Sequence, residues 1–338
     1  MNRQLRDRYG VSAARRCLRL IALLLTVSAA SFFLMSISPL DPLKTNVGQA
    51  ALGSMSEEQI TRLKAYWGVE IPAPKRYVNW LLGVLQGDFG TSLLYRRPVL
   101  EVIGEKAVNS LWLMGSAWLF SGIFGAALGI LAGVNQGKWQ DKLVTGYCMV
   151  MAGTPSFWLA LVLLLLLAVK LPLFPIGFSV PVGVAASEVT MADRLYHAVL
   201  PALTLGLTGV SNIAMHARSK MIEIMESDFI CYARARGESG WQLFYRHGLR
   251  SILLPVITLQ FASVSEIFGG SVLVEQVFSY PGLGQAAVTA GLGSDAPLLL
   301  GITVFSAFLV FSGNTAADLL YAVVDPRMRR QRRKGAGL

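Results

Sequence analysis

Six long apolar windows constrain this 338-residue chain more than any other feature. A bilayer core about 30 Å thick needs roughly 20 apolar residues in each helix that crosses it. In chain order the windows are Leu18–Ser38, Leu111–Gly133, Leu143–Val169, Val199–Met215, Leu253–Val274 and Leu298–Val323. Only 15% of the residues are charged, whereas a soluble domain averages about a quarter. We therefore predict an all-α polytopic membrane protein with six transmembrane helices.

The first and fourth windows need separate arguments. The apolar stretch of the first is longer than the 7–15 residues of a cleaved signal sequence, so we expect an uncleaved anchor helix. The fourth, Val199–Met215, is short and is interrupted by Pro201 and several glycines. Such residues are tolerated in spanning helices where neighbours satisfy the freed backbone groups. We retain this span because removing it would invert the charge distribution along the chain.

The distribution of Lys and Arg predicts the orientation. With the N-terminus inside and Arg19 included, the inner segments hold 20 of these residues and the outer segments hold 10. Because cytoplasmic segments collect basic residues, we expect both termini inside. The predicted parts are a cytosolic N-terminus 1–17, a first span 18–38, an outer loop 39–106, a core 107–323 with the other five spans, a cytosolic loop 216–250 and a basic cytosolic tail 324–338.

Signatures of catalysis and cofactor binding are missing from the sequence. The segment Gly133–Lys138 has the wrong spacing for a phosphate-binding loop and no following Ser or Thr. Cys17, Cys148 and Cys231 show neither metal-ligand spacing nor a pairing pattern. The formal charge of +10 is spread over short segments beside apolar runs, which does not suggest nucleic-acid binding. We expect no catalytic residue, no metal site and no enzyme.

The outer loop contains the pattern of a short amphipathic helix. Ser56 and Gln59 have the spacing of a capping box, and Ile60, Leu63 and Trp67 follow at helical intervals. The helix could simply lie on the outer surface, or it could form part of a docking surface for an external partner.

The inner loop 216–250 combines aromatic residues with arginines. Phe229, Tyr232, Ala233 and Arg236 fall on one face of a short helix for which Asp228 is a plausible N-cap. Gly237 then permits a C-cap or a sharp turn. Such a helix suits docking into a groove of a cytosolic partner, and it equally suits a position on anionic lipid. Periodicity alone leaves both interpretations open.

Two acidic residues lie within the windows. A charge at the centre of a spanning helix costs roughly 2.5–3.5 kcal/mol on insertion scales, so it usually faces a cavity or a partner. Glu266 lies close to Gly269 and Gly270, and it either lines a pathway or is hydrogen-bonded to another helix. Asp318 lies near the inner end of the last window, where water can solvate it.

Motifs in the inner loop bring in a family resemblance. The segment Tyr232–Gly237 (YARARG), followed by Arg246-His247 and Leu253–Pro255, resembles the cytosolic loop of the dipeptide/oligopeptide/nickel permeases of ABC importers. Of the general importer loop motif only Ala233 and Gly237 survive. Six other segments resemble motifs of this family and occur in the same order: Ser38–Pro42, Gly87–Ser92, Arg97–Val99, Thr154–Trp158, Val274–Gly284 and Asp325–Arg327.

The resemblance implies a type I ABC importer permease fold, the first permease of a pair, in a bacterial inner membrane. It implies a second homologous permease, two ATPase subunits that bind ATP and Mg²⁺, and an extracytoplasmic solute-binding protein. A coupling helix around 229–241 would enter an ATPase groove, with Ala233 and Gly237 small because the helix packs closely there. The coupling residues it implies are Phe229, Tyr232, Ala233, Arg234, Arg236, Gly237, Glu238, Trp241 and Pro255.

The resemblance leaves the substrate open. Di- and oligopeptides are the first expectation. Nickel or a metal-chelate (metallophore) complex is the alternative, because Glu266 followed by Gly269 and Gly270 resembles the nickel-type members. These three residues are the pathway candidates. A cation exporter on the same fold and a proton-coupled secondary transporter, with Glu266 and Asp318 as a relay, are more distant alternatives.

Overall fold

The structure is a computed structural model that describes residues 3–38, 42–67, 71–181, 183–184, 188–238 and 240–324. Within these ranges the chain is helical and contains no β-strand, apart from one isolated bridge between Thr91 and Pro98. It divides into two compact units, Met1–Val108 with Gly282–Phe311 and Asn109–Pro281 with Ser312–Leu338. Residues 39–41 of the motif after the first window, and the predicted tail from Asp325 onward, lie outside the described residues.

The first unit contains α1 and the long loop that follows it. Its elements are α1 (Arg3–Ile37), α2 (Pro42–Val47), α3 (Gln49–Ser54), α4 (Glu57–Trp67), α5 (Ala73–Leu85), α14 (Leu283–Leu292) and the first parts of α6 (Val99–Val134) and α15 (Ala296–Val324). The predicted capping box begins α4, because Gln59 N donates to Ser56 Oγ at 3.3 Å and Ser56 N donates to Gln59 Oε1 at 3.0 Å. Trp67 is buried, as the amphipathic pattern predicted.

The core of this unit forms between α6, α14 and α15. Val99, Val102 and Ile103 occupy one helical face of α6 and pack against buried residues of the other two helices, including Leu283 and Leu298. This i, i+3, i+4 spacing is what one buried helix face requires. A satisfied buried carboxylate fixes the start of α15, since Asp295 accepts from Ser92 Oγ at 2.6 Å and from the backbone N–H of Leu94 and Leu298.

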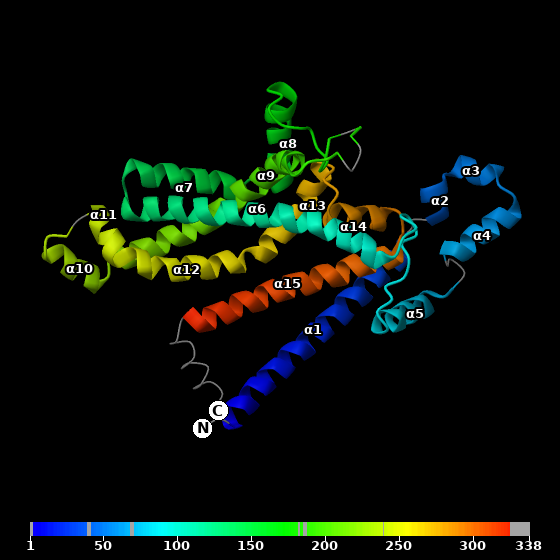
Figure 1. Ribbon diagram of the computed structural model, residues 1–338, viewed down its shortest axis with the longest axis horizontal. Coiled ribbons are helices and arrows are strands. Elements are labelled where there is room, and N and C mark those ends of the chain that lie inside the picture. The colour runs from blue at the N-terminus through cyan, green and yellow to red at the C-terminus, as the bar shows by residue number, and fades with distance from the viewer. Residues whose placement is uncertain are drawn as a thin grey trace. The chain divides into compact units, whose positions relative to one another are not determined.

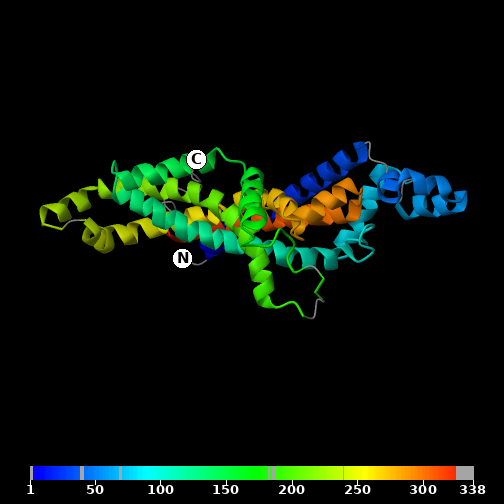
Figure 2. The same cartoon turned by 90° about the horizontal axis from the view of Figure 1, so that it is seen from above.

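The second unit is a helical bundle. Its elements are the rest of α6, α7 (Trp139–Ala152), α8 (Ser156–Leu163), the π-helical turn η1 (Leu164–Lys170), α9 (Met191–Met225), α10 (Asp228–Ala235), α11 (Gly240–Leu243), η2 (Phe244–Gly248), α12 (Leu249–Ala262) and α13 (Val264–Val277). The helices α7, α9 and α12 run alongside the second half of α6 (Figure 1, Figure 2).

Glycines let α6 and α9 approach closely. A Cβ added at Gly129 would lie 2.4 Å from the Ala214 carbonyl oxygen, and one added at Gly133 would lie 2.5 Å from Met221 Cβ. The four-residue spacing places both glycines on one face of α6. Small residues at such contacts are typical of helices that pack within a membrane, where close van der Waals contact drives association.

Four described helices are long and apolar enough to cross a membrane, and the number is six if each of two bent helix pairs forms one span. The fourth window was predicted too short, because α9 continues on both sides of it with Pro201 buried inside. A capping box formed by Thr190 and Asp193 begins this helix. The last ten residues of α9 therefore fall within the loop predicted to begin at 216.

The third and fifth windows are not straight helices. The halves of the third, α7 and α8 with η1, meet at an angle of 104° (Figure 1). Pro155 explains this break, since it has no N–H to donate and restricts Thr154 before it to non-helical conformations. The halves of the fifth, α12 and α13, meet at 44° around Ser263. Ser263 Oγ donates to the Gln260 carbonyl at 2.8 Å, a local bond of the kind that bends helices.

Candidate functional site

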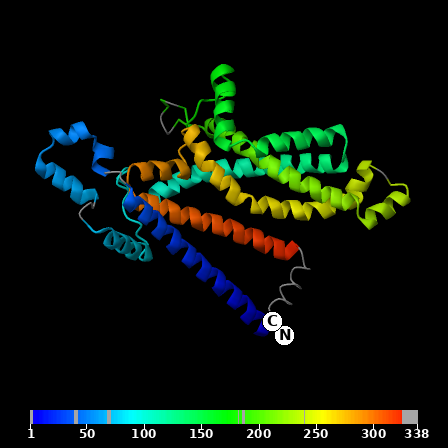
Figure 3. The ribbon, with the colours of Figure 1, turned by 180° about the vertical axis from the view of Figure 1, so that it is seen from behind.

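The segment between α9 and α12 contains the predicted coupling residues, at the end of the bundle (Figure 3). The sequence suggested Asp228 as the N-cap of its first helix, α10, but the helix begins one residue earlier than that. Asp228 is the first helical residue, and Ser227 occupies the N-cap position with an extended backbone. Ser227 makes no side-chain cap, because its hydroxyl donates to the Ile224 carbonyl. The carboxylate of Asp228 still lies in the first turn, where it favours the helix dipole.

The inward face of α10 is formed by Ile230 and Ala233. Both are buried and pack with Leu243 of α11 and with Ile224 at the end of α9. Ala233 was expected to be small because a partner packs against it, but its side chain is covered by residues of the same chain. Burial of this small cluster fixes the rotation of α10 about its own axis.

The outward face carries Phe229 and Tyr232, so the four residues predicted to share one face are divided between two. The Tyr232 side chain is 69% exposed and that of Tyr245 in η2 is 66% exposed. Arg234, Arg236 and Arg246 are exposed as well. We call Phe229, Tyr232, Arg234, Arg236, Tyr245 and Arg246 the aromatic–arginine surface. Trp241 lies in α11, and its side chain is outside the part of the chain that the structure describes.

A Schellman motif ends α10. Gly237 N donates to the Arg234 carbonyl at 2.9 Å, and Glu238 N donates to the Ala233 carbonyl at 3.2 Å. These two bonds require a left-handed residue at the intervening position, and Gly237 has φ +92°. A Cβ added to Gly237 would meet nothing within 4 Å. Gly237 is therefore required by the backbone conformation and not, within this chain, by close packing.

The Glu238 side chain links the two ends of the segment. Its carboxylate lies 3.1 Å from Nε2 of His247 and 3.7 Å from Nη1 of Arg246, while the Glu238 side chain is only 14% exposed. Just beyond, Phe244 is buried among Met221, Met225 and Ile252. Apolar packing therefore attaches the segment to α9 and α12, while the Glu238 contacts join the end of α10 to η2.

Pro255 does not belong to this surface. It lies inside α12, half-buried and well beyond the segment that forms the aromatic–arginine surface.

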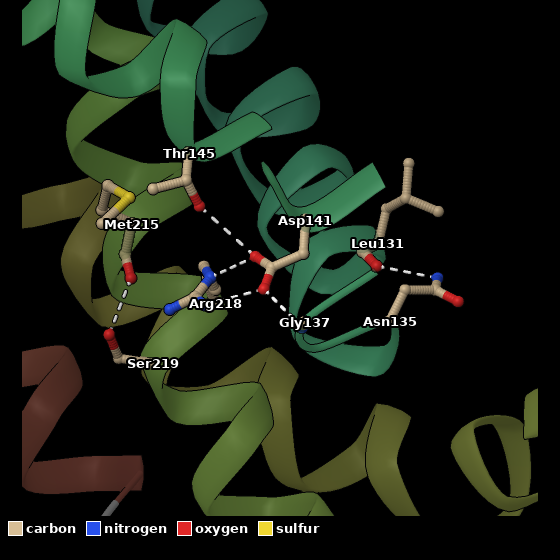
Figure 4. A network of polar contacts seen from close by, with 8 residues as sticks. All are labelled: Leu131, Asn135, Gly137, Asp141, Thr145, Met215, Arg218 and Ser219. Atoms are coloured by element: carbon tan, nitrogen blue, oxygen red, sulfur yellow. Dashed lines mark hydrogen bonds and ion pairs between the residues drawn. The ribbon is translucent and has the colours of Figure 1, made fainter. Parts of the chain in front are cut away.

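An ion pair that sequence reasoning missed joins α7 to α9. Arg218 donates from Nε to Asp141 Oδ1 at 2.5 Å and from Nη2 to Oδ2 at 2.9 Å (Figure 4). The same carboxylate accepts from Gly137 N at 2.9 Å and from Thr145 Oγ1 at 3.3 Å. The Asp141 side chain is 5% exposed, and a two-pronged contact of this kind is directional as well as strong. Sequence spacing gives no signal for it, because the partners are far apart in the chain.

The pathway candidates lie on α13. Glu266 accepts a hydrogen bond from Nδ2 of Asn212 on α9 at 2.6 Å, which is the contact to another helix considered from the sequence. The Glu266 side chain is nevertheless exposed in the single chain. At Gly270 an added Cβ would lie 3.3 Å from Leu205 of α9, whereas at Gly269 it would meet open space. Only Gly270 therefore permits a close approach of a neighbouring helix within the chain.

A second acidic residue of α13, Glu275, was overlooked in the sequence. It is fully buried and accepts from Ser110 Oγ on α6 at 2.6 Å. Tyr280, just after α13, has its pKa raised to about 12 by burial and then by the nearby Glu275 charge, so its hydroxyl stays protonated. The available signal was the position of Glu275 inside the motif Val274–Gly284.

Comparisons with known proteins match this sequence over nearly the whole chain. A family described as binding-protein-dependent transport system inner membrane component matches residues 125–330, and its N-terminal companion matches residues 12–102. The oligopeptide transport system permease protein AppB of Bacillus subtilis is 35% identical over 93% of this chain and 98% of its own length.

Two further relatives are also named as transport permeases. The glutathione transport system permease protein GsiC of Salmonella typhimurium is 32% identical over 93% of this chain and 97% of its own length. A putative peptide transport system permease protein of Brucella abortus is 32% identical over 93% of this chain and 98% of its own length. With its apolar helices and these matches, the chain belongs to the inner membrane permeases of binding-protein-dependent ABC importers of the peptide family.

Proposed function

We propose that this chain is the permease subunit of an ATP-driven importer of di- and oligopeptides, and that the aromatic–arginine surface binds an ATPase subunit. The observation that supports the ATPase contact is the division of α10 into two faces. Ile230 and Ala233 hold the helix against its own chain, while Phe229 and Tyr232 are exposed and unused by the fold. Exposed aromatic residues with arginines beside them are the residue types that dominate protein interfaces.

The proposal includes the rest of the assembly. A second homologous permease completes the pathway, two ATPase subunits bind ATP and Mg²⁺, and an extracytoplasmic solute-binding protein delivers the substrate. The basic residues counted above support a position of both termini and of the aromatic–arginine surface in the cytosol. Glu266, Gly269 and Gly270 are proposed to face the pathway, which is consistent with the exposure of Glu266 and Gly269 in the single chain.

Peptides are preferred as substrates because the relatives described above are named for oligopeptides, peptides and glutathione. The nickel or metal-chelate alternative rested on Glu266 and the two glycines. Glu266 is hydrogen-bonded by the Asn212 amide, a neutral partner that does not distinguish a metal pathway from a structural contact. Among the described residues, no group of His, Cys, Asp and Glu side chains could hold a metal ion, so these residues do not favour metal over peptide.

The test replaces Phe229 and Tyr232 with alanine, singly and together. Because both rings are exposed, we expect unchanged membrane insertion and thermal stability. We expect affinity for the ATPase subunit to fall at least about tenfold, as for a central interface aromatic. Uptake of a labelled oligopeptide is expected to fall with it. Co-purification of the ATPase and peptide uptake in cells are the measurements.

Trp139→Ala is the matched control, because Trp139 is an aromatic residue as exposed as Tyr232, at the start of α7 and outside this surface. We expect ATPase binding by this variant to equal that of the parent. Full ATPase binding by the Phe229 and Tyr232 double variant would reject the docking assignment. Uptake of a nickel chelate but of no peptide by the parent protein would reject the substrate class.

A further inference from the structure

A cavity of about 400 Å³ lies in the first unit, between the end of α1 and the helices α4 and α5. Phe32, Met35 and Ser36 line it from the last turns of α1, and Pro297 and Leu300 line it from the first turns of α15. The C-terminal end of α1 and the beginning of α15 are both ends of membrane-spanning segments. Side chains this close to a span end lie at the level where lipid headgroups meet acyl chains. The cavity therefore lies at one boundary of the membrane.

The wall contributed by α4 and α5 is aromatic. Tyr66 and Trp67 line the cavity from the end of α4, and Trp80 lines it from α5. The helix α5 lies beside the end of α1 (Figure 1, Figure 3), and the hydroxyl groups of Ser28 and Tyr77 join them at 2.9 Å. Trp and Tyr are enriched at membrane boundaries, because one end of each side chain is apolar and the other forms hydrogen bonds.

Two residues that line this cavity each carry a buried hydrogen-bond donor with no acceptor among the described residues. Nε of Arg76 and Nε1 of Trp80 are buried atoms without a hydrogen-bond partner among the described residues, and both residues line the cavity. No ion pair of the described residues includes Arg76. Buried donors are nearly always satisfied in native proteins, and an unsatisfied donor calls for an unseen partner.

The position of the Arg76 guanidinium is fixed by the protein. Its Cζ lies 5.8 Å from the centre of the Phe32 ring, a cation–π contact with a residue of α1. Phe32 is itself buried. A guanidinium that is held in place and has no ion-pair partner among the described residues favours an oxyanion, because its planar N–H groups match phosphate geometry.

From these observations we propose that this cavity binds one anionic phospholipid, with the phosphate at Arg76 and Trp80 and the first part of an acyl chain along Met35 and Leu300. The apolar wall accounts for the acyl chain, and the two donors without a partner among the described residues account for the phosphate. The span ends explain why an apolar wall and polar donors occur together at the membrane boundary. The proposal does not depend on the transported substrate or on the ATPase contact.

The test is a titration of the delipidated full-length chain in detergent with phosphatidylglycerol, followed by native mass spectrometry. We expect one lipid to bind more tightly than the rest, and Arg76→Gln to weaken that binding about tenfold. Trp80→Phe keeps an aromatic ring and removes the N–H, so we expect a loss of roughly three- to tenfold. This second variant covers the case in which Arg76→Gln does not fold.

Lys75→Gln is the matched control. Lys75 precedes Arg76 on α5, is exposed and does not line the cavity, so removing its charge should change lipid binding by less than about twofold. The same variants are compared by the rise in melting temperature that phosphatidylglycerol produces, which Arg76→Gln should lose and Lys75→Gln should keep.

Two outcomes would overturn the proposal. Equal lipid affinity in Arg76→Gln and Lys75→Gln would show that the contact is general lipid adhesion. Displacement of the bound lipid by a dipeptide, but not by its C-terminal amide, would show that Arg76 holds a peptide carboxylate instead.

Discussion

At the scale of single residues, Gly237 shows how one position can be small for either of two reasons. The family resemblance suggests close packing against a partner, whereas the structure shows a left-handed backbone with open space around the missing Cβ. The two causes rank substitutions in opposite orders, because alanine is smaller than asparagine but asparagine adopts left-handed conformations more easily.

We expect Gly237→Asn to retain more transport than Gly237→Ala. Alanine should destabilise the end of α10 by about 1–2 kcal/mol, the cost of a left-handed conformation for a residue with a Cβ. Gly237→Trp should abolish transport while membrane insertion stays normal. A bulky residue is unfavourable both in a left-handed conformation and in close packing against a partner. Peptide uptake, measured at equal protein level, shows which variant transports better. Better transport by the alanine variant would mean that close packing, and not backbone conformation, requires glycine at this position.

Ala233 gives the complementary lesson. Helical periodicity places residues around a helix, but it does not say which of them turn inward. The grouping of Phe229, Tyr232 and Ala233 ignored Ile230, which is fully buried and sets the inward direction together with Ala233. The exposed aromatic residues were thus predicted from the sequence, while the support beneath them was not.

At the scale of elements, the contact between α7 and α9 includes the ion pair of Asp141 and Arg218 beside apolar packing. Removing the carboxylate leaves a guanidinium and the Gly137 N–H without their acceptor. We expect Asp141→Ala to lower stability by about 3 kcal/mol, in the range for a broken buried pair. The double variant with Arg218→Ala should lose less than the sum, because the two groups act as a unit. Unfolding in detergent gives these values.

The exposed pair Glu58 and Arg62 on α4 is the control for this prediction. The two side chains are 2.7 Å apart but remain mostly exposed, so their alanine variants should change stability by no more than about 0.5 kcal/mol. Additive losses at Asp141 and Arg218 would mean that the pair does not couple α7 to α9.

The positions of the spans were predictable and the breaks within them were not predicted. Hydropathy locates a segment by its apolar content, which a bend does not alter. For the third window the proline rule was available, since Thr154-Pro155 interrupts the helix in the way that any residue before proline does. For the fifth there was no such signal, because Ser263 bends the helix through a local hydrogen bond. Asp141 and Glu275 were missed because their partners are distant in the chain.

At the scale of the whole molecule, the two exposed native cysteines provide a test of orientation. Cys17 and Cys231 are exposed, whereas Cys148 is buried. If both termini and α10 are in the cytosol, a membrane-impermeant maleimide should label neither exposed thiol in intact cells and both after permeabilisation. Mass spectrometry of the labelled peptides measures this.

A variant with cysteine in place of Lys64 is the positive control, because Lys64 is exposed on α4 in the predicted outer loop. This thiol should react in intact cells. Labelling of Cys231 before permeabilisation would reverse the proposed orientation.

The two faces of α10 are also subject to different evolutionary constraints. Substitutions at Ile230 and Ala233 must fit the chain's own Leu243 and Ile224, so these positions change in step with neighbours in the same gene. Phe229 and Tyr232 are exposed and lie outside that buried cluster, so this chain constrains their substitutions less. If the aromatic–arginine surface binds an ATPase subunit as proposed, a new pairing between permease and ATPase can arise through a few outward side chains, without rebuilding the helix that carries them.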